Sequence, residues 1–279
     1  MKRIDAHQHF WRLERARREY TWLTEAEYPE LYRDFLPGDL APLLSECGIE
    51  RTILVQGAET VAETEFLLGI AHETPFVGGV VGWVDFAARD APALIERLAD
   101  DRKLVGLRPM LQSLDDDEWV LQPALGRTFD ALQRHALTFD ALVFPRQLSA
   151  IERLLRRYPD LAVVIDHGAK PYIARGEIEP WKSTIAAIAR DSGAFCKLSG
   201  LATEAASGWS AATLEPYVDV LIESFGPDRL MWGSDWPVLN VAGDYPTWYL
   251  IAQQLTARLS ADDRARIFGE TAARFYGVD

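Results

Sequence analysis

Short apolar segments recur along the whole chain, and segments with helical periodicity separate them. Eight such segments are present, at residues 4–9, 52–56, 77–83, 104–108, 138–143, 162–167, 194–199 and 229–234. Because these segments are continuously apolar rather than alternating, they predict strands that are buried on both faces, as in a parallel sheet. Between them, residues such as Leu148, Ile151 and Leu155 repeat at helical spacing until Pro159 ends that helix.

Eight strands that alternate with helices predict a (β/α)8 barrel of the TIM type, in the α/β class. The length of 279 residues is close to the usual size of one such barrel. Since no linker or change of composition divides the chain, we expect one domain over residues 1–279. The sequence leaves the oligomeric state open.

Two long loops interrupt the alternation. Residues 11–37 follow the first predicted strand and residues 110–123 follow the fourth. Both leave the carboxyl ends of strands, the end at which barrel enzymes carry their active sites. The first insertion contains Trp11, Tyr20, Trp22, Tyr28 and Tyr32. These aromatic residues either form a lid or pocket wall or pack the insertion onto the barrel.

The charge of the chain limits its partners. The formal net charge of -13 argues against nucleic acid and anionic membranes. No apolar stretch has the length of a transmembrane helix, and no signal peptide is recognisable at the start. Cys47 and Cys196 lack metal-binding or redox spacing, so we expect reduced, buried thiols. Together these features predict a cytoplasmic, soluble protein.

Polar residues close several of the apolar segments. His7 and His9 stand two apart on the first predicted strand, so both side chains face the same side. His167 follows the sixth strand and Asp235 follows the eighth. Imidazoles bind divalent transition metals, and a carboxylate among them adds charge and a base. We predict that these four residues are catalytic, and they are also the candidate metal ligands.

Each of these four residues also has a structural interpretation. A pair of core histidines is disfavoured, because two buried imidazoles without partners are costly. Asp235 could instead cap a turn before Trp236 and Pro237. His72 and His135 lie at the ends of predicted helices, where a cation complements the helix dipole, and are left out of the site.

Further residues are candidates for binding a substrate. Arg108 closes the fourth strand, where it would either bind substrate or pair with an acidic residue. Gln112, Trp83 and Trp236 are weaker candidates, since tryptophan suits a sugar ring but also packs barrels. Lys197, inside the seventh strand, would either reach the site or be a paired core residue.

Four sequence motifs in this order resemble those of the amidohydrolase superfamily, specifically its lactonase branch. They are Asp5-Ala6-His7-Gln8-His9-Phe10-Trp11, Gly106-Leu107-Arg108 with Leu111-Gln112, Asp166-His167-Gly168-Ala169-Lys170-Pro171, and Trp232-Gly233-Ser234-Asp235-Trp236-Pro237. That branch includes hydrolases of L-fuconolactone and L-rhamnonolactone, and the 2-pyrone-4,6-dicarboxylate lactonase. The resemblance spans essentially the whole chain.

The resemblance implies hydrolysis of a lactone. Asp235 would act as general base and acid, and the histidines would polarise the carbonyl with or without one divalent metal such as zinc. Binuclear members carry a bridging lysine or glutamate on the fourth strand and two downstream histidines. Here that strand ends in Arg108 and only His167 matches, so the sequence predicts at most one metal, which need not be required for activity.

Substrate choice rests on the number of cations. A dicarboxylate needs several, because buried carboxylates must be paired. Arg108 is placed at the strand ends, whereas Arg146 and Lys170 are placed only loosely. This favours a neutral sugar lactone, L-fuconolactone first. The alternatives are 2-pyrone-4,6-dicarboxylate lactonase, a metal-dependent decarboxylase of the same superfamily and a non-catalytic binding barrel.

Overall fold

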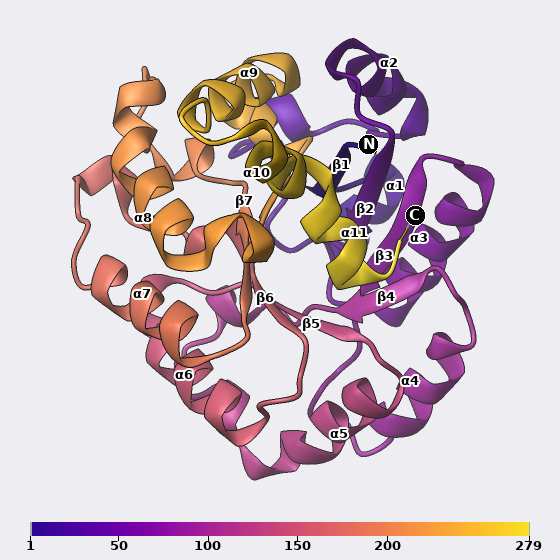
Figure 1. The fold of residues 1–279 in the computed structure, drawn as a ribbon. Coiled ribbons are helices and arrows are strands. Elements are labelled where there is room, and N and C mark those ends of the chain that lie inside the picture. Colours follow the sequence, from indigo (N-terminus) through magenta and orange to yellow (C-terminus); the bar gives the residue numbers. More distant parts are fainter. Residues whose placement is uncertain (1, 279) are drawn as a thin grey trace.

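Eight parallel strands form the centre of the molecule, and helices surround them (Figure 1). The computed structural model describes residues 2–278. The strands are β1 (Ile4–Gln8), β2 (Arg51–Val55), β3 (Val77–Gly82), β4 (Leu104–Leu107), β5 (Thr138–Ala141), β6 (Val163–Ile165), β7 (Phe195–Leu198) and β8 (Leu230–Trp232). They pair in sequence order. The predicted (β/α)8 barrel is therefore confirmed, and each predicted strand end lies within two residues of the observed one.

Helices follow the strands along the chain. They are α1 (Leu13–Glu19), α2 (Pro37–Cys47), α3 (Val61–Glu73), α4 (Ala91–Ala99), α5 (Gly126–Arg134), α6 (Leu148–Arg157), α7 (Trp181–Asp191), α8 (Ala211–Arg229), α9 (Tyr245–Leu255), α10 (Ala261–Ala265) and α11 (Thr271–Tyr276). The short helix α1 lies inside the predicted insertion. A π-helical turn (Arg266–Glu270) joins α10 to α11, and Ser260 caps α10 by accepting a hydrogen bond from the Asp263 amide.

Hydrogen bonds between β1 and the segment after β8 join the first and last strands. The amide of Asp235 donates to the His7 carbonyl oxygen at 2.8 Å, and the amide of His9 donates to the Trp236 carbonyl oxygen at 2.7 Å. Asp5 Oδ1 accepts a hydrogen bond from the Ser234 amide. Burial raises the pKa of Asp5 to about 6. This seam holds three of the predicted catalytic residues in fixed register.

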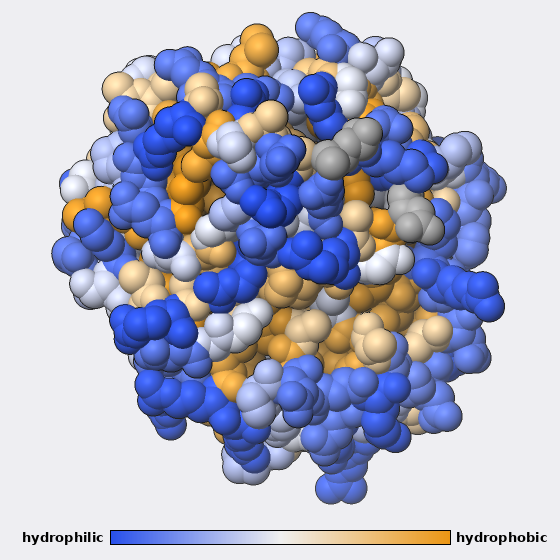
Figure 2. Space-filling model, in the orientation of Figure 1, coloured by the Kyte–Doolittle hydropathy of each residue, from blue (hydrophilic) through white to orange (hydrophobic). Residues whose placement is uncertain are grey.

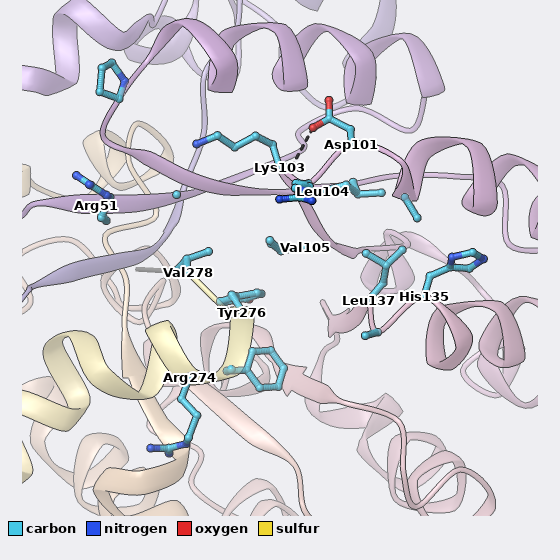
Figure 3. Close-up of a pocket in the computed structure, with 17 residues that line it drawn as sticks. Arg51, Asp101, Lys103, Leu104, Val105, His135, Leu137, Arg274, Tyr276 and Val278 are labelled. Carbon is cyan, nitrogen blue, oxygen red and sulfur yellow. Dashed lines mark hydrogen bonds between the residues drawn. The ribbon is translucent and has the colours of Figure 1, made fainter.

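The amino-terminal end of the barrel carries a cavity of about 660 Å3 beneath α11. Figure 3 shows Lys103, His135, Arg274 and Tyr276 among the residues around it. In Figure 2, hydrophilic residues cover most of this face, and hydrophobic residues are visible below α11 in the view. His72, on α3, pairs with Asp101 at 2.8 Å. His72 and His135 therefore both lie away from the carboxyl ends of the strands.

Cys47 and Cys196 are free and buried, as predicted. Among residues 2–278, the helices are too short or too polar for any of them to cross a bilayer.

Candidate active site

The structure brings the four predicted catalytic residues together at the carboxyl end of the barrel. Asp235 Oδ1 lies 3.2 Å from His9 Nε2, 3.7 Å from His7 Nε2 and 3.9 Å from His167 Nε2. All four side chains are buried. One carboxylate oxygen is therefore surrounded by three imidazole nitrogens.

His167 and Asp235 both adopt left-handed backbone conformations, with φ of 54° and 61°. Such conformations are strained for residues with a Cβ atom and are common at functional sites. The structure around each residue holds it in place. Nδ1 of His167 lies 2.8 Å from Ser199 Oγ, and the backbone amide of Asp235 donates a hydrogen bond to the His7 carbonyl oxygen in β1.

The hydrogen bonds of His9 determine which of its nitrogens carries the proton. Nδ1 lies 2.8 Å from the carbonyl oxygen of Val55, which can only accept, so Nδ1 carries a hydrogen. In the neutral ring, Nε2 then presents a lone pair to Asp235 Oδ1 at 3.2 Å. Two electron-rich atoms at this distance need a proton or a cation between them. The site is built for one or the other.

Burial and neighbouring charges set the ionisation of the site. Burial by itself would raise the pKa of Asp235, but His167, the hydrogen bond from His9 and His7 together hold it well below its ordinary value. Burial lowers the pKa of His167 to about 4. Burial and the Lys197 ammonium hold the pKa of His7 well below its ordinary value. Asp235 is therefore ionised, and His7 and His167 beside it are neutral.

Arg108 is paired with an acidic residue and also lines the cavity of the site, so substrate binding by Arg108 stays a prediction. Its Nη1 lies 3.3 Å from Asp166 Oδ2 and 3.3 Å from His7 Nε2, and its Nη2 donates to the Gln56 carbonyl oxygen. It is thus paired with an acidic residue. It also lines the cavity of the site.

Lys197, on β7, contacts the site through His7. Its ammonium lies 2.7 Å from Asp140 Oδ2, 2.9 Å from Asp166 Oδ1 and 3.1 Å from His7 Nδ1. Tyr276, on α11, donates to Asp140 Oδ2 at 2.6 Å. Both interpretations of Lys197 hold, because it is a paired core residue that also contacts a site histidine.

A cavity of about 410 Å3 opens above these residues. Its lining includes His9, His167, Asp235 and Arg108, while His7 lies beneath its floor. The insertion and the second long loop complete the walls. They contribute Glu19, Thr21, Trp22, Tyr28, Met110, Gln112 and Ser113.

The insertion (residues 11–37) both lines the cavity and packs onto the barrel. Trp22 lines the cavity and donates through Nε1 to the Gly57 carbonyl oxygen at 3.0 Å, whereas Trp11 and Tyr20 are buried. Among residues 2–278, those lining the cavity include neither Trp83 nor Trp236. Trp236 packs instead against Phe10 and Phe35.

Asp166 and Glu204 belong to the site and had not been predicted from the sequence, whereas Lys170 had been placed there only loosely. Asp166, next to His167, pairs with both Lys197 and Arg108, and its position at a strand end is the signal that would have found it. Lys170 and Glu204 form an ion pair in the cavity wall. No sequence spacing connects those two residues.

Comparison with known proteins places this site in a family. A profile of the family described as amidohydrolase matches residues 4–278. The chain belongs to the amidohydrolase family. This confirms the resemblance seen in the sequence.

Two relatives are named L-fucono-1,5-lactonase. The protein from Burkholderia ambifaria is 48% identical over 99% of this chain and 96% of its own length. The one from Burkholderia multivorans is 38% identical, with the same coverage. A crystal structure of an amidohydrolase from Burkholderia multivorans with bound zinc is 36% identical, covers 100% of both chains and has a TM-score of 0.93. These relatives support the predicted lactone hydrolysis.

Proposed function

We propose that this protein hydrolyses a sugar lactone, with L-fucono-1,5-lactone as the first candidate. The observation that carries the proposal is the carboxylate of Asp235, kept ionised among three imidazoles at the floor of a cavity. The two relatives named L-fucono-1,5-lactonase support the choice of substrate.

The arrangement provides a base that activates water and groups that stabilise the charge on the carbonyl oxygen, and ester hydrolysis needs both. Asp235 takes a proton from water as the water oxygen bonds to the lactone carbonyl carbon. His167 and Arg108, which line the cavity beside Asp235, stabilise the negative charge that develops on the carbonyl oxygen. Asp235 then returns its proton to the ring oxygen as the bond between that oxygen and the carbonyl carbon breaks. The product is the open hydroxy acid.

The site also fits one divalent metal. His7, His9 and Asp235 offer ligand atoms within 4.8 Å of one another, and His167 Nε2 faces the same carboxylate oxygen. Two types of ligand, imidazole and carboxylate, suit zinc. When bound, the ion would polarise the carbonyl as a Lewis acid. We propose zinc as the first candidate for this ion. We also propose that lactone hydrolysis does not require it.

The charges of the cavity favour a neutral substrate. Arg108 is paired with Asp166, Lys170 with Glu204 and Arg146 with Asp117. A dicarboxylate would therefore have to break existing ion pairs to find partners. Glu19, Glu59 and Glu204 line the cavity and offer acceptors for sugar hydroxyl groups. This supports a sugar lactone over 2-pyrone-4,6-dicarboxylate.

A hydrolysis assay tests the proposal. Acid release would be followed with a pH indicator for L-fucono-, L-rhamnono- and related lactones and for 2-pyrone-4,6-dicarboxylate, with and without a chelator. We expect hydrolysis of L-fuconolactone. No hydrolysis of any substrate, even with added zinc, would overturn the proposal, and release of CO2 from an aromatic acid would identify a decarboxylase instead.

We also propose that the protein works in the cytoplasm. The support is its two buried free thiols, which suit a reducing compartment.

A further inference from the structure

We propose that the side-chain amide of Gln112 binds a hydroxyl group of the sugar ring and so makes the site selective for hydroxylated lactones. Gln112 lies in the turn Leu111–Ser113, which follows β4, and it lines the cavity that also contains Asp235. The inference rests on the proposed function, since it names the part of the substrate that one wall of that cavity recognises.

The backbone of Gln112 is held on both sides by other residues. Its amide donates a hydrogen bond to the Leu142 carbonyl oxygen at 3.0 Å, and its own carbonyl oxygen accepts one from Arg146 Nη2 at 3.0 Å. Arg146 is in turn paired with Asp117. These contacts fix the position of Gln112 at the cavity wall, so binding has to order only the side chain.

The side chain of Gln112, in contrast, makes no hydrogen bond to the residues that the structure describes. Its Oε1 is buried and has no partner among residues 2–278. A buried polar atom without a partner is costly, so it calls for an explanation. Because no described residue fixes the amide plane, rotation about the last side-chain bond can turn either the oxygen or the nitrogen toward a ligand. A hydroxyl group both donates and accepts, so it suits either end of the amide.

Gln147 shows a structural glutamine in the same part of the molecule. Its Nε2 donates to the Leu111 carbonyl oxygen at 2.6 Å, and its Oε1 accepts from the Phe144 amide at 2.9 Å. Both ends of this amide are therefore satisfied, and Gln147 supports the turn that carries Gln112. The contrast between the two amides indicates that the partner of Gln112 comes from outside the chain.

The charges of the cavity favour a neutral group as that partner. Glu19, Glu59 and Glu204 line the same cavity as Gln112, and the arginine and the lysine of its lining are already in ion pairs. A carboxylate at Gln112 would face these glutamates, and an amide has no charge with which to neutralise it. A hydroxyl group of a neutral sugar lactone meets no such penalty.

Q112M tests the proposal, because methionine keeps the length of the side chain and removes the amide. The variant is assayed with L-fucono-1,5-lactone and with δ-valerolactone, which has the same six-membered ester ring without hydroxyl groups. We expect the loss in kcat/KM to be about tenfold larger for L-fuconolactone than for δ-valerolactone. Equal losses for the two lactones would overturn the proposal, since Gln112 would then act on the carbonyl group or on the fold.

Q147M is the matched control. It removes both hydrogen bonds of the structural glutamine, so we expect equal losses for the two lactones and a lower thermal unfolding temperature. Q112M should unfold at the temperature of the wild-type protein or above it, since it removes a buried atom that has no partner among residues 2–278. A fall for Q112M as large as that for Q147M would show a structural role and contradict the proposal.

Binding of 1,5-anhydro-L-fucitol gives a readout without turnover. This cyclic ether keeps the ring hydroxyl groups but has no carbonyl group, so it is not hydrolysed. In ligand-observed NMR titrations we expect Q112M to bind it about tenfold more weakly than the wild-type protein. Equal affinity, or no binding to the wild-type protein, would overturn the proposal whatever the lactone assays show. If no lactone is hydrolysed while Q112M still weakens binding of the ether, the proposed hydrolysis fails and this inference stands.

Discussion

At the residue scale, the site depends on a carboxylate that stays charged where burial opposes its charge. Asp235 is 4% exposed, yet three imidazole nitrogens within 3.9 Å of Oδ1 hold its pKa below the ordinary value. An ionised carboxylate can accept a proton from water. The proposed proton transfer therefore takes place at the carboxylate of Asp235.

We expect D235N to lower kcat/KM by about a thousandfold, because an amide cannot accept the proton of water. Steady-state hydrolysis of L-fuconolactone measures the change. The thermal unfolding temperature and circular dichroism of the variant serve as the control for folding. A folded D235N protein that keeps most of its activity would remove Asp235 from the role of base.

At the element scale, the insertion between β1 and α2 joins the wall of the site to the outer helices. Trp22 lines the cavity, while Tyr20 donates a hydrogen bond to Glu63 on α3. Glu63 also accepts a hydrogen bond from the Gly57 amide. The insertion is thus tied to α3 through one buried carboxylate.

We expect W22A to raise KM by about tenfold and to change kcat little. The indole ring offers an apolar face to a bound sugar, and its loss removes ground-state and transition-state binding alike. W22F, which keeps a ring but loses the hydrogen bond to Gly57, should give an intermediate KM. An unchanged KM in W22A would show that this wall does not contact the substrate.

Glu63 should make stability depend on pH. Burial raises its pKa to about 7, so the folded protein keeps a proton on Glu63 that the unfolded chain, with an ordinary pKa of 4.5, releases. The folded state then binds more protons between pH 4.5 and 7, and stability from this group falls as the pH rises through that range. The full effect is at most about 3 kcal/mol.

We expect E63Q to flatten this slope, because an uncharged amide can keep the bonds from Tyr20 and Gly57. Urea unfolding measured from about pH 5 to about pH 8 checks the prediction. If the wild-type protein and E63Q lose stability in parallel over this range, another group is responsible.

At the scale of the whole molecule, hydrogen bonds between the β1 segment and the residues after β8 connect the two ends of the sheet, and this seam also positions the site. His7 and His9 stand on one side of the seam and Asp235 on the other. Gly233 allows the close approach, because a Cβ atom there would lie 2.9 Å from His7 Cβ and 3.1 Å from His7 N. The close contact between Gly233 and His7 therefore affects both the stability of the protein and the geometry of the site.

We expect G233A to destabilise the protein by about 1–3 kcal/mol through overpacking and to reduce activity by displacing His7. G69A is the matched control. Gly69 lies in α3 with nothing within 4 Å of an added Cβ atom, so alanine there should stabilise the protein by about 0.5–1 kcal/mol. Equal effects of the two changes on unfolding would contradict the close approach at the seam.

The sequence by itself determined the elements of this protein. Continuous apolar segments predicted the eight strands, and the positions of His7, His9, His167 and Asp235 at strand ends predicted that they would meet. This works because a parallel barrel brings all carboxyl strand ends to one face. Periodicity and strand order are local properties, and a sequence records them directly.

Only the tertiary structure decided the partners of each side chain. Trp236 faces Phe10 and Phe35 rather than the cavity, and Lys197 contacts a site histidine. Lys170 pairs with Glu204 across a separation that no spacing rule covers. Hydrogen bonds and ion pairs require atoms of residues far apart in the chain to be placed to within a few tenths of an ångström. Those distances, and with them the tautomers and charges of the site, exist only once the barrel has closed.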